Sequence, residues 1–286
     1  MVTSPVRITT DDGARLAVTV VEPAGPPLGL VVAGHAMFVC GRTLRLIARA
    51  LADRGFLVWA LDFRGHGLSQ ADDPRTDWSY DDIVLSDIPV ALRAAEAVGL
   101  PVFLLGHSLG GHAGLAALAA DPTLRVAGVV ALGANVWMPR FAEDAIAHAK
   151  SLAIVTAWTA LTRAVGYFPV RRLGLGTDDE AASYVRQLAR TARSDRWASL
   201  DGSIDYLVAL SQLRVPVLSV SSRGDTWMCR PEAAQRFMAF VGGPVTHRVV
   251  GDGEGEASDI DHMGLVLDRR MEPVWAEVGS WLLAHR

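Results

Sequence analysis

The order of short apolar segments and helical segments is the feature that most limits the fold of this chain. Four uninterrupted apolar segments, each of strand length, alternate with segments of helical pattern. They are residues 30–33, 56–61, 102–105 and 126–132. Strands that are apolar on both faces are typical of a parallel sheet covered by helices on each side. The sequence therefore predicts an α/β fold with a mostly parallel central sheet flanked by helices.

The segments between these strands have the spacing of amphipathic helices. Apolar residues recur at helical intervals in residues 42–54, 81–98 and 109–120. Pro89 lies inside the second of these segments, where it should kink or restart the helix because it lacks a backbone N–H. A further strand is expected at residues 15–21, before the alternation begins.

The alternation stops at residue 135 and resumes only after residue 212. The interrupting segment is helical in pattern, and we expect no buried strand in it. The late elements follow as a strand at 217–221, a helix at 231–241, a strand at 246–250 and a helix at 271–284. We interpret residues 135–212 as a helical cap inserted before the late strands, with a core domain made of residues 1–134 and 213–286. Extra helices packed beside the core are the alternative.

The sharpest motif is Gly106-His107-Ser108-Leu109-Gly110, which fits the G-x-S-x-G pattern of a nucleophile elbow. A predicted strand precedes it and a predicted helix follows it, as this turn requires. A serine on so tight a turn has a strained backbone, and the glycines on either side leave room for the close approach of other chain segments. Ser108 is therefore the candidate nucleophile.

A serine nucleophile needs a base and an acid to orient that base. His262 is the candidate base, because it follows the last strand in a polar loop and chain order Ser, acid, His suits this motif. His247 falls inside a predicted strand and His285 lies at the chain end, so both fit less well. Asp225, just past the strand that ends at residue 221, is the candidate acid. The alternatives are Asp252, Asp259 and Asp261.

The remaining site residues are predicted from their places on loops that follow strands. Backbone amides of Met37 and Leu109 are the expected oxyanion donors, with Ala36 as a neighbour of the first. His35 is expected to be structural rather than catalytic, although it lies beside the substrate. The predicted substrate pocket consists of His35, Ala36, Trp137, Met138, Trp227 and Met228. Trp158, Phe141 and Phe168 are further aromatic candidates in the cap.

Other ligand classes are not expected. His107 and His112 are five residues apart and do not share a helix face, so no metal site and no cofactor are predicted. A net charge of −4 without a basic stripe argues against nucleic acid. The two cysteines, Cys40 and Cys229, cannot form a disulfide scaffold, and the polar N-terminus does not resemble a secretory signal; we therefore expect a cytoplasmic protein without integral membrane association. The expected partner is a small acyl substrate, and a homodimer is left open.

From about residue 29 to the C-terminus, the chain resembles the α/β-hydrolase superfamily of serine hydrolase type. The segments that carry the resemblance are the elbow GHSLGG, the turn DFRGHGLS, and the late RGD and DHMG segments. A segment of the cap that begins at Gly166 also resembles a bacterial group of predicted α/β-hydrolases with no agreed substrate. The superfamily usually has His-Gly in the oxyanion loop, where this chain has His35 and Ala36.

Together these features predict a serine hydrolase that cleaves a carboxylic ester or thioester through an acyl-serine intermediate. The aromatic residues of the cap indicate a largely apolar substrate. An acyltransferase or cyclase is the alternative if the cap keeps water out. A non-catalytic binding protein and a lipase acting at a membrane surface are also left open.

Overall fold

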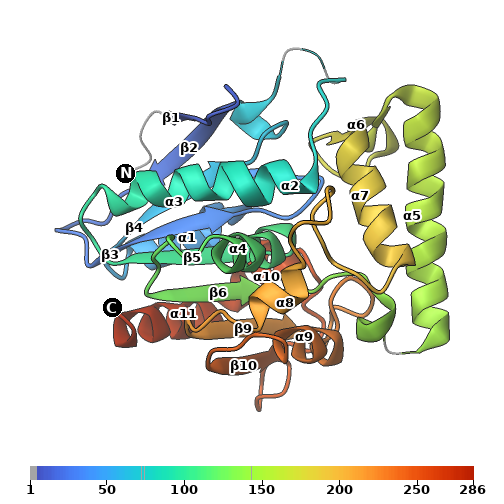
Figure 1. Cartoon of the computed structure of the whole chain (residues 1–286). Coiled ribbons are helices and arrows are strands. Elements are labelled where there is room, and N and C mark those ends of the chain that lie inside the picture. The colour runs from blue at the N-terminus through green and yellow to red at the C-terminus, as the bar shows by residue number, and fades with distance from the viewer. Residues whose placement is uncertain (1–4, 72, 74, 143) are drawn as a thin grey trace.

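The computed structural model describes residues 5–71, 73, 75–142 and 144–286. Its centre is an eight-stranded sheet in the order β1-β2-β4-β3-β5-β6-β9-β10 (Figure 1). The strands are β1 (Val6–Thr9), β2 (Arg15–Val21), β3 (Gly29–Gly34), β4 (Phe56–Asp62), β5 (Val102–His107), β6 (Gly128–Leu132), β9 (Val217–Ser222) and β10 (Val245–Val250). Only the pairs β1–β2 and β2–β4 are antiparallel, so the prediction of a mostly parallel sheet is confirmed.

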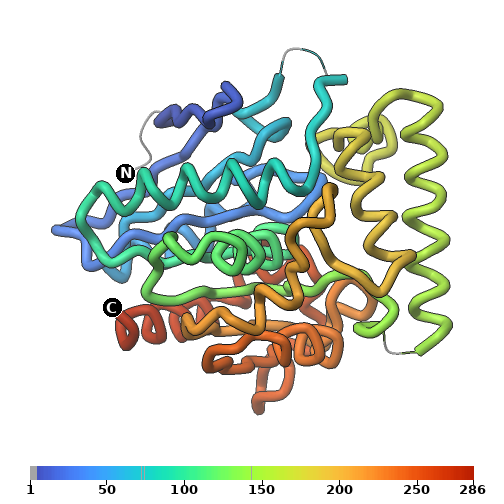
Figure 2. The backbone as a smooth tube through the Cα atoms, in the orientation of Figure 1, coloured from blue at the N-terminus to red at the C-terminus, as the bar shows by residue number. Residues whose placement is uncertain are grey.

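Helices cover both faces of this sheet, as expected for strands that are apolar on both sides. The helices are α1 (Arg45–Ala52), α2 (Tyr80–Asp82), α3 (Ile88–Glu96), α4 (Leu109–Ala120), α5 (Ala145–Val165), α6 (Val170–Leu173), α7 (Ala182–Arg193), α8 (Tyr206–Leu210), α9 (Pro231–Met238), α10 (Gly264–Leu267) and α11 (Glu272–Ala284). One hydrophobic core cluster joins α1, α10 and α11 to the sheet, and a larger one joins α3, α4, α8 and α9 to it. Figure 2 shows the N-terminal strands and the late strand β10 at opposite edges of the sheet.

Chain order reverses on either side of β3, which pairs with β4 on one side and β5 on the other. At such a switch point the loops that leave the carboxyl ends of neighbouring strands diverge and open a crevice. The loop after β3 and the turn after β5 therefore meet at this crevice. They carry the predicted oxyanion residue Met37 and the predicted nucleophile Ser108.

The helix around Pro89 changes form without a break. A π-helical turn at Ile83–Asp87 joins α2 to α3, with Ile88 N–H donating to Ile83 O, and Pro89 follows directly after this turn. The helix predicted at residues 81–98 is therefore altered next to Pro89, which has no backbone N–H to donate.

The segment 135–212 places α5, α6 and α7 at one end of the sheet (Figure 1), whereas α8 packs against α4. The expectation of no buried strand in this segment was wrong. The short strands β7 (Tyr167–Phe168) and β8 (Glu180–Ala181) form a buried antiparallel pair. Two residues are too few to give an apolar alternation in the sequence. The edge strand β1 was also not predicted, because its exposed residues give no such pattern.

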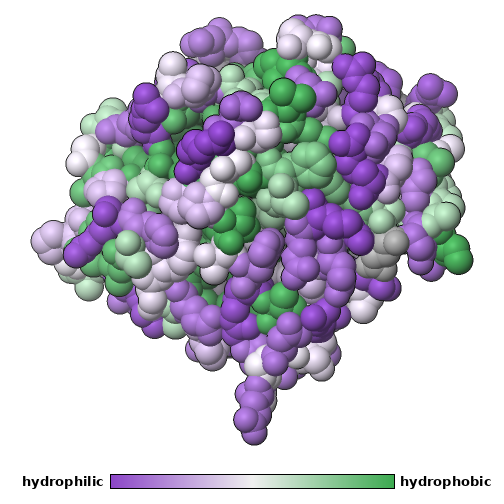
Figure 3. All heavy atoms as spheres, turned by 60° about the horizontal axis from the view of Figure 1, so that its bottom comes forward, coloured by the Kyte–Doolittle hydropathy of each residue, from purple (hydrophilic) through white to green (hydrophobic). Residues whose placement is uncertain are grey.

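The face in Figure 3 mixes hydrophilic and hydrophobic residues, with the hydrophobic ones in separate patches. Within the described residues, none of the helices combines the length and the apolar character that crossing a bilayer would need.

Candidate active site

Ser108 lies on the sharp turn between β5 and α4. Its backbone has φ 51° and ψ −110°, a conformation that costs a residue with a side chain about 1–3 kcal/mol. Its amide donates to the carbonyl of Leu132 over 2.8 Å. A Cβ atom at Gly106 would lie 2.2 Å from the backbone of Gly110, and one at Gly110 would lie 2.3 Å from the carbonyl oxygen of Gly34. The crowding predicted for this turn is therefore present.

His262 and Asp225 form a buried pair. The Nδ1–H of His262 donates to Oδ2 of Asp225 over 2.5 Å, and the amide of Met228 donates to Oδ1 over 3.0 Å. Burial alone would raise the pKa of the Asp225 carboxyl, but these hydrogen bonds hold it below its usual value. The charged carboxylate fixes the proton on Nδ1, so Nε2 of His262 is left as the basic nitrogen. Nε2 is buried and has no hydrogen-bond partner among the described residues.

The alternative acids and bases make other contacts. Asp252 pairs with Arg223 and Asp259 with Arg270, both on the surface. Asp261 lines the same cavity as Ser108, but its carboxylate accepts from the amide of Gly264. Of the alternative bases, His247 lies in the edge strand β10, and His285 stacks on Trp281.

His35 fixes the peptide that carries the predicted oxyanion donor. A carbonyl only accepts and an amide only donates, so Nδ1 of His35 donates to Ala36 O over 2.7 Å and Nε2 accepts from Phe63 N over 3.1 Å. Ala36 C=O and Met37 N–H belong to one trans peptide and point in opposite directions. The imidazole therefore sets the direction of the Met37 amide. The ring is fully buried, so the prediction that His35 lines the substrate pocket is corrected.

Two backbone amides next to Ser108 are free to bind an anion. Neither Met37 N–H nor Leu109 N–H donates to an acceptor in the described parts of the chain. Both residues line a small recess that also contains Ser108. The loop and the helix that carry them are joined, because Gly110 N–H donates to His35 O over 2.9 Å. This arrangement suits an oxyanion formed at a carbonyl attacked by Ser108.

The two histidines that flank the elbow are hydrogen bonded to other parts of the chain, and His112 also lines the recess that contains Ser108. His107 donates from Nε2 to the carbonyl oxygen of His262 over 3.0 Å, and burial lowers the pKa of His107 to about 3. It therefore supports the loop of His262 as a neutral ring. His112 is hydrogen bonded to the hydroxyl of Tyr80 at 3.0 Å, and burial lowers its pKa to about 3 as well.

Ser108, Asp225 and His262 line one cavity of about 510 Å³, which we call the Ser108 cavity. Of the predicted pocket residues, Ala36, Trp227 and Met228 line it, and so does Met37, the predicted oxyanion donor. Trp158, one of the further aromatic candidates, also lines it. The walls that were not predicted include Phe38, Ile154, Leu175 and Met263. Ile154 and Trp158 are four residues apart on α5 and so share one face of that helix, a spacing from which this wall could have been predicted.

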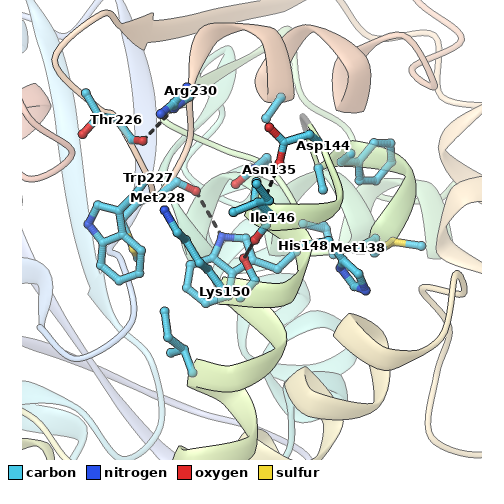
Figure 4. Close-up of a pocket in the computed structure, with 18 of the residues that line it drawn as sticks. Asn135, Met138, Asp144, Ile146, His148, Lys150, Thr226, Trp227, Met228 and Arg230 are labelled. Atoms are coloured by element: carbon cyan, nitrogen blue, oxygen red, sulfur yellow. Dashed lines mark hydrogen bonds between the residues drawn. The ribbon is translucent and has the colours of Figure 1, made fainter.

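A second pocket of about 590 Å³, the side pocket, lies next to the Ser108 cavity (Figure 4). Both are lined by Ile154 and by three residues of the segment 226–230, which are Thr226, Trp227 and Met228. Trp137 lines the side pocket and packs its ring against Trp158 and Trp227, which line the Ser108 cavity. Its indole nitrogen donates to Met228 O over 3.1 Å. Met138 lines the side pocket alone, so its predicted place in the pocket at the nucleophile is corrected.

Nothing in the described residues groups three or more His, Cys, Asp or Glu side chains in a way that could hold a metal ion. The chemistry that these side chains can perform without one is nucleophilic attack by a serine with base assistance and anion stabilisation.

The chain is similar to one protein family and to several known proteins. The family model described as "Serine aminopeptidase, S33" matches residues 25–250. Monoglyceride lipase from Homo sapiens is 32% identical over 120 residues, and the rat enzyme (Rattus norvegicus) is 34% identical over 122 residues. Each match covers 39% of this chain and 37% of the relative, so the chain spans little more than a third of these relatives.

Solved structures resemble the whole chain. An esterase from Exiguobacterium antarcticum has a TM-score of 0.65 and 20% identity over 98% of this chain and 99% of the esterase. The esterase domain of a Rhodothermus marinus protein has a TM-score of 0.63 and 21% identity over 99% and 98% of the two chains. At these identities the likeness shows a common fold.

Proposed function

Because this chain belongs to the hydrolase family described as serine aminopeptidase, S33, we propose that it is a serine-dependent carboxylic ester hydrolase acting through an acyl-serine intermediate. The observation that carries the proposal is the buried His262–Asp225 pair, which leaves Nε2 of His262 unpartnered in the cavity of Ser108. Thioesters suit the same chemistry. The relatives that are esterases and monoglyceride lipases favour oxygen esters.

In the proposed reaction His262 Nε2 takes the proton of Ser108 Oγ as this oxygen attacks the substrate carbonyl. The amides of Met37 and Leu109 bind the oxyanion. The imidazolium, stabilised by Asp225, then gives its proton to the leaving alcohol, and an acyl-serine remains. Water, deprotonated by His262, hydrolyses this ester and restores the serine.

The substrate we propose is small and largely apolar. The Ser108 cavity is walled mainly by aromatic and aliphatic side chains, and α5 covers one side of it with Ile154 and Trp158. The side pocket would take a longer acyl chain or leaving group past Ile154 and Trp227. A cavity of a few hundred Å³ matches a small molecule better than a polypeptide.

The test is hydrolysis of p-nitrophenyl esters from acetate to decanoate by the wild type, Ser108→Ala and the exposed control Ser280→Ala. We expect turnover in the wild type and control and none above background in Ser108→Ala. A fluorophosphonate should label only the two proteins that keep Ser108. A thioester and an aminoacyl p-nitroanilide, included in the same series, separate the alternatives. Preference for the anilide, or turnover that survives in Ser108→Ala, would reject the proposal.

A second candidate, hydrolysis of lipid esters at an aggregate surface, is favoured by exposed hydrophobic side chains around the two pockets. Trp227 is 60% exposed, Leu175 51% and Ile146 68%. These residues would contact an apolar surface. Activity on a monoacylglycerol that rises steeply above its critical micelle concentration would support this candidate, and a smooth saturation curve through that concentration would reject it.

A further inference from the structure

Phe38 follows the proposed oxyanion donor Met37 and is held by a segment far along the chain. Its φ of 69° is the only positive value besides that of Ser108 among described residues other than glycine. The Phe38 amide donates to Oε1 of Glu180 over 2.7 Å. Its carbonyl accepts from the amides of Thr177 and Asp178 over 2.8 and 3.0 Å. Both backbone polar groups of this strained residue are therefore bound by residues 177–180.

The Glu180 carboxylate accepts hydrogen bonds in a buried site. Its side chain and that of His66 are both fully buried, and Oε1 lies 3.3 Å from Nε2 of His66. His66 also donates from Nδ1 to Arg64 O, so a second donation from Nε2 requires the imidazolium form. Burial opposes this form, but Glu180, together with nearby Asp178, outweighs it and raises the pKa of His66 to about 9.

Other groups complete the surroundings of His66. The centroid of the His35 ring lies 4.9 Å from that of His66, and the centroid of the Trp78 ring lies 5.3 Å from it. The Asp62 carboxylate, at the end of β4, also acts on His66 electrostatically. Burial lowers the pKa of His35 well below its usual value, so that ring is neutral. Oε2 of Glu180 is buried and has no partner among the described residues, so Oε1 alone makes the contacts of this carboxylate.

We infer that Glu180 is a positioning residue, which holds the loop of Phe38 so that the Met37 amide faces the oxyanion formed at Ser108. The inference rests on the proposed function. The peptide before Met37 is fixed by His35, and the peptide after it by Glu180. Without the second bond, the strained Phe38 would relax and turn the Met37 amide. Through Glu180 the inserted segment would take part in catalysis as well as in covering the cavity.

Two conservative variants separate the position of this oxygen from its charge. Glu180→Gln keeps an acceptor oxygen at the same reach and removes the charge. Glu180→Asp keeps the charge and withdraws the oxygen from the Phe38 amide by one methylene. We expect kcat on p-nitrophenyl butyrate to fall about 10- to 100-fold in Glu180→Asp with little change in KM, because a misplaced donor acts on the transition state. Glu180→Gln should keep most of the wild-type kcat.

Asp178→Asn is the matched control. The Asp178 side chain ties the same segment to the core by accepting from Gly67 N–H and Gln70, but it does not touch Phe38. Its kcat should stay near the wild-type value. The inference is overturned if Glu180→Asp does not lose at least tenfold more kcat than both Glu180→Gln and Asp178→Asn.

Hydrogen–deuterium exchange of residues 36–39 tests the same contact without turnover. Exchange should be faster in Glu180→Asp than in the wild type, Glu180→Gln or Asp178→Asn, and equal exchange in all four proteins would overturn the inference. A wild type without esterase activity but with this exchange pattern would reject the proposed function and support the role of Glu180 in holding the loop.

Discussion

Asp225 controls which nitrogen of His262 carries the proton. In Asp225→Asn the amide would no longer demand a proton on Nδ1, and the tautomer with Nε2–H could not accept the proton of Ser108. We expect kcat for p-nitrophenyl butyrate to fall about 10⁴-fold, the loss typical for such a change in a serine triad. Steady-state kinetics on purified protein measures it.

Asp252→Asn is the control for this variant. Asp252 was one of the alternatives to Asp225 in the sequence analysis. It forms an exposed ion pair with Arg223. Its kcat should stay within about twofold of the wild type, because the Asp252 side chain is exposed and does not line the Ser108 cavity. A loss in Asp252→Asn comparable with that in Asp225→Asn would contradict the assignment.

At the scale of single residues, the sequence identified candidates for the site where the local context of the residue was enough to single it out. Ser108 is recognisable because a strand, a glycine turn and a helix meet there, and His262 and Asp225 because they follow late strands in the right order. Glu180 gave no such signal, since its contact with Phe38 joins residues 142 positions apart. His35 was expected to be structural, but its bond to the neighbouring carbonyl required coordinates.

The elbow itself depends on how closely α4 approaches β3. In Gly110→Ala the new methyl group would collide with the backbone of Gly34, which cannot move without shifting the central sheet. We expect the free energy of unfolding to fall by about 1–3 kcal/mol or more, as for other overpacked cores. Chemical denaturation followed by circular dichroism measures it.

Gly25→Ala is the matched control for the elbow variant. No atom lies within 4 Å of the methyl group it would add, and its φ is not in the left-handed region. The change in unfolding free energy should stay within about 0.5 kcal/mol. Equal losses in the two variants would show that close approach at Gly110 is not what requires glycine.

Helix α5 lines both the Ser108 cavity and the side pocket. Ile154 is common to the two linings, so the tryptophan in Ile154→Trp would take up space where the pockets adjoin. We expect kcat/KM for the decanoate ester, divided by kcat/KM for the acetate ester, to fall roughly tenfold. The tryptophan would occupy the space that the longer acyl chain needs. The control Ile146→Trp makes the same change on α5 in the side pocket alone and should alter the ratio less. An unchanged ratio in Ile154→Trp would show that acyl chains do not take this path.

The bounds of helices and strands were predictable where the apolar pattern in the sequence was long. Strand β2 and helix α4 have the predicted bounds, and the other buried strands differ by one or two residues. The pair β7–β8 was not predicted, because its strands are set by the docking of the inserted segment rather than by local periodicity.

At the scale of the molecule, the inserted segment does not have a large core of its own. Its Phe168, Tyr184 and Trp197 belong to the same hydrophobic cluster as the sheet residues, and a separate small cluster between α5 and α7 has only Val155, Ala189 and Ala192 as fully buried members among the described residues. The stability of this segment is therefore coupled to that of the sheet. Sequence periodicity gives no indication of this shared packing, because it reports contacts within one segment only.

The buried pair of His66 and Glu180 joins the inserted segment to the sheet and makes stability depend on pH. The pKa of His66 is about 9 in the folded protein, above the usual value of 6.5 that it regains on unfolding. Protonation of His66 therefore favours the folded state. Its contribution is fully present below pH 6.5, declines as pH rises, and is lost above pH 9.

The expected loss between pH 6.5 and 9.5 is on the order of 3 kcal/mol, the free energy equivalent of this pKa difference. Urea unfolding at both pH values in the wild type and Glu180→Gln measures it. The variant lacks the charge that raises the pKa of His66, so its unfolding free energy should fall less between the two values, while groups that titrate in both proteins cancel in the comparison. His247→Gln, which alters an exposed histidine of the edge strand, should keep the wild-type dependence. Equal losses in the wild type and Glu180→Gln would mean that His66 is neutral in the folded protein and that the insertion is held by packing and neutral hydrogen bonds alone.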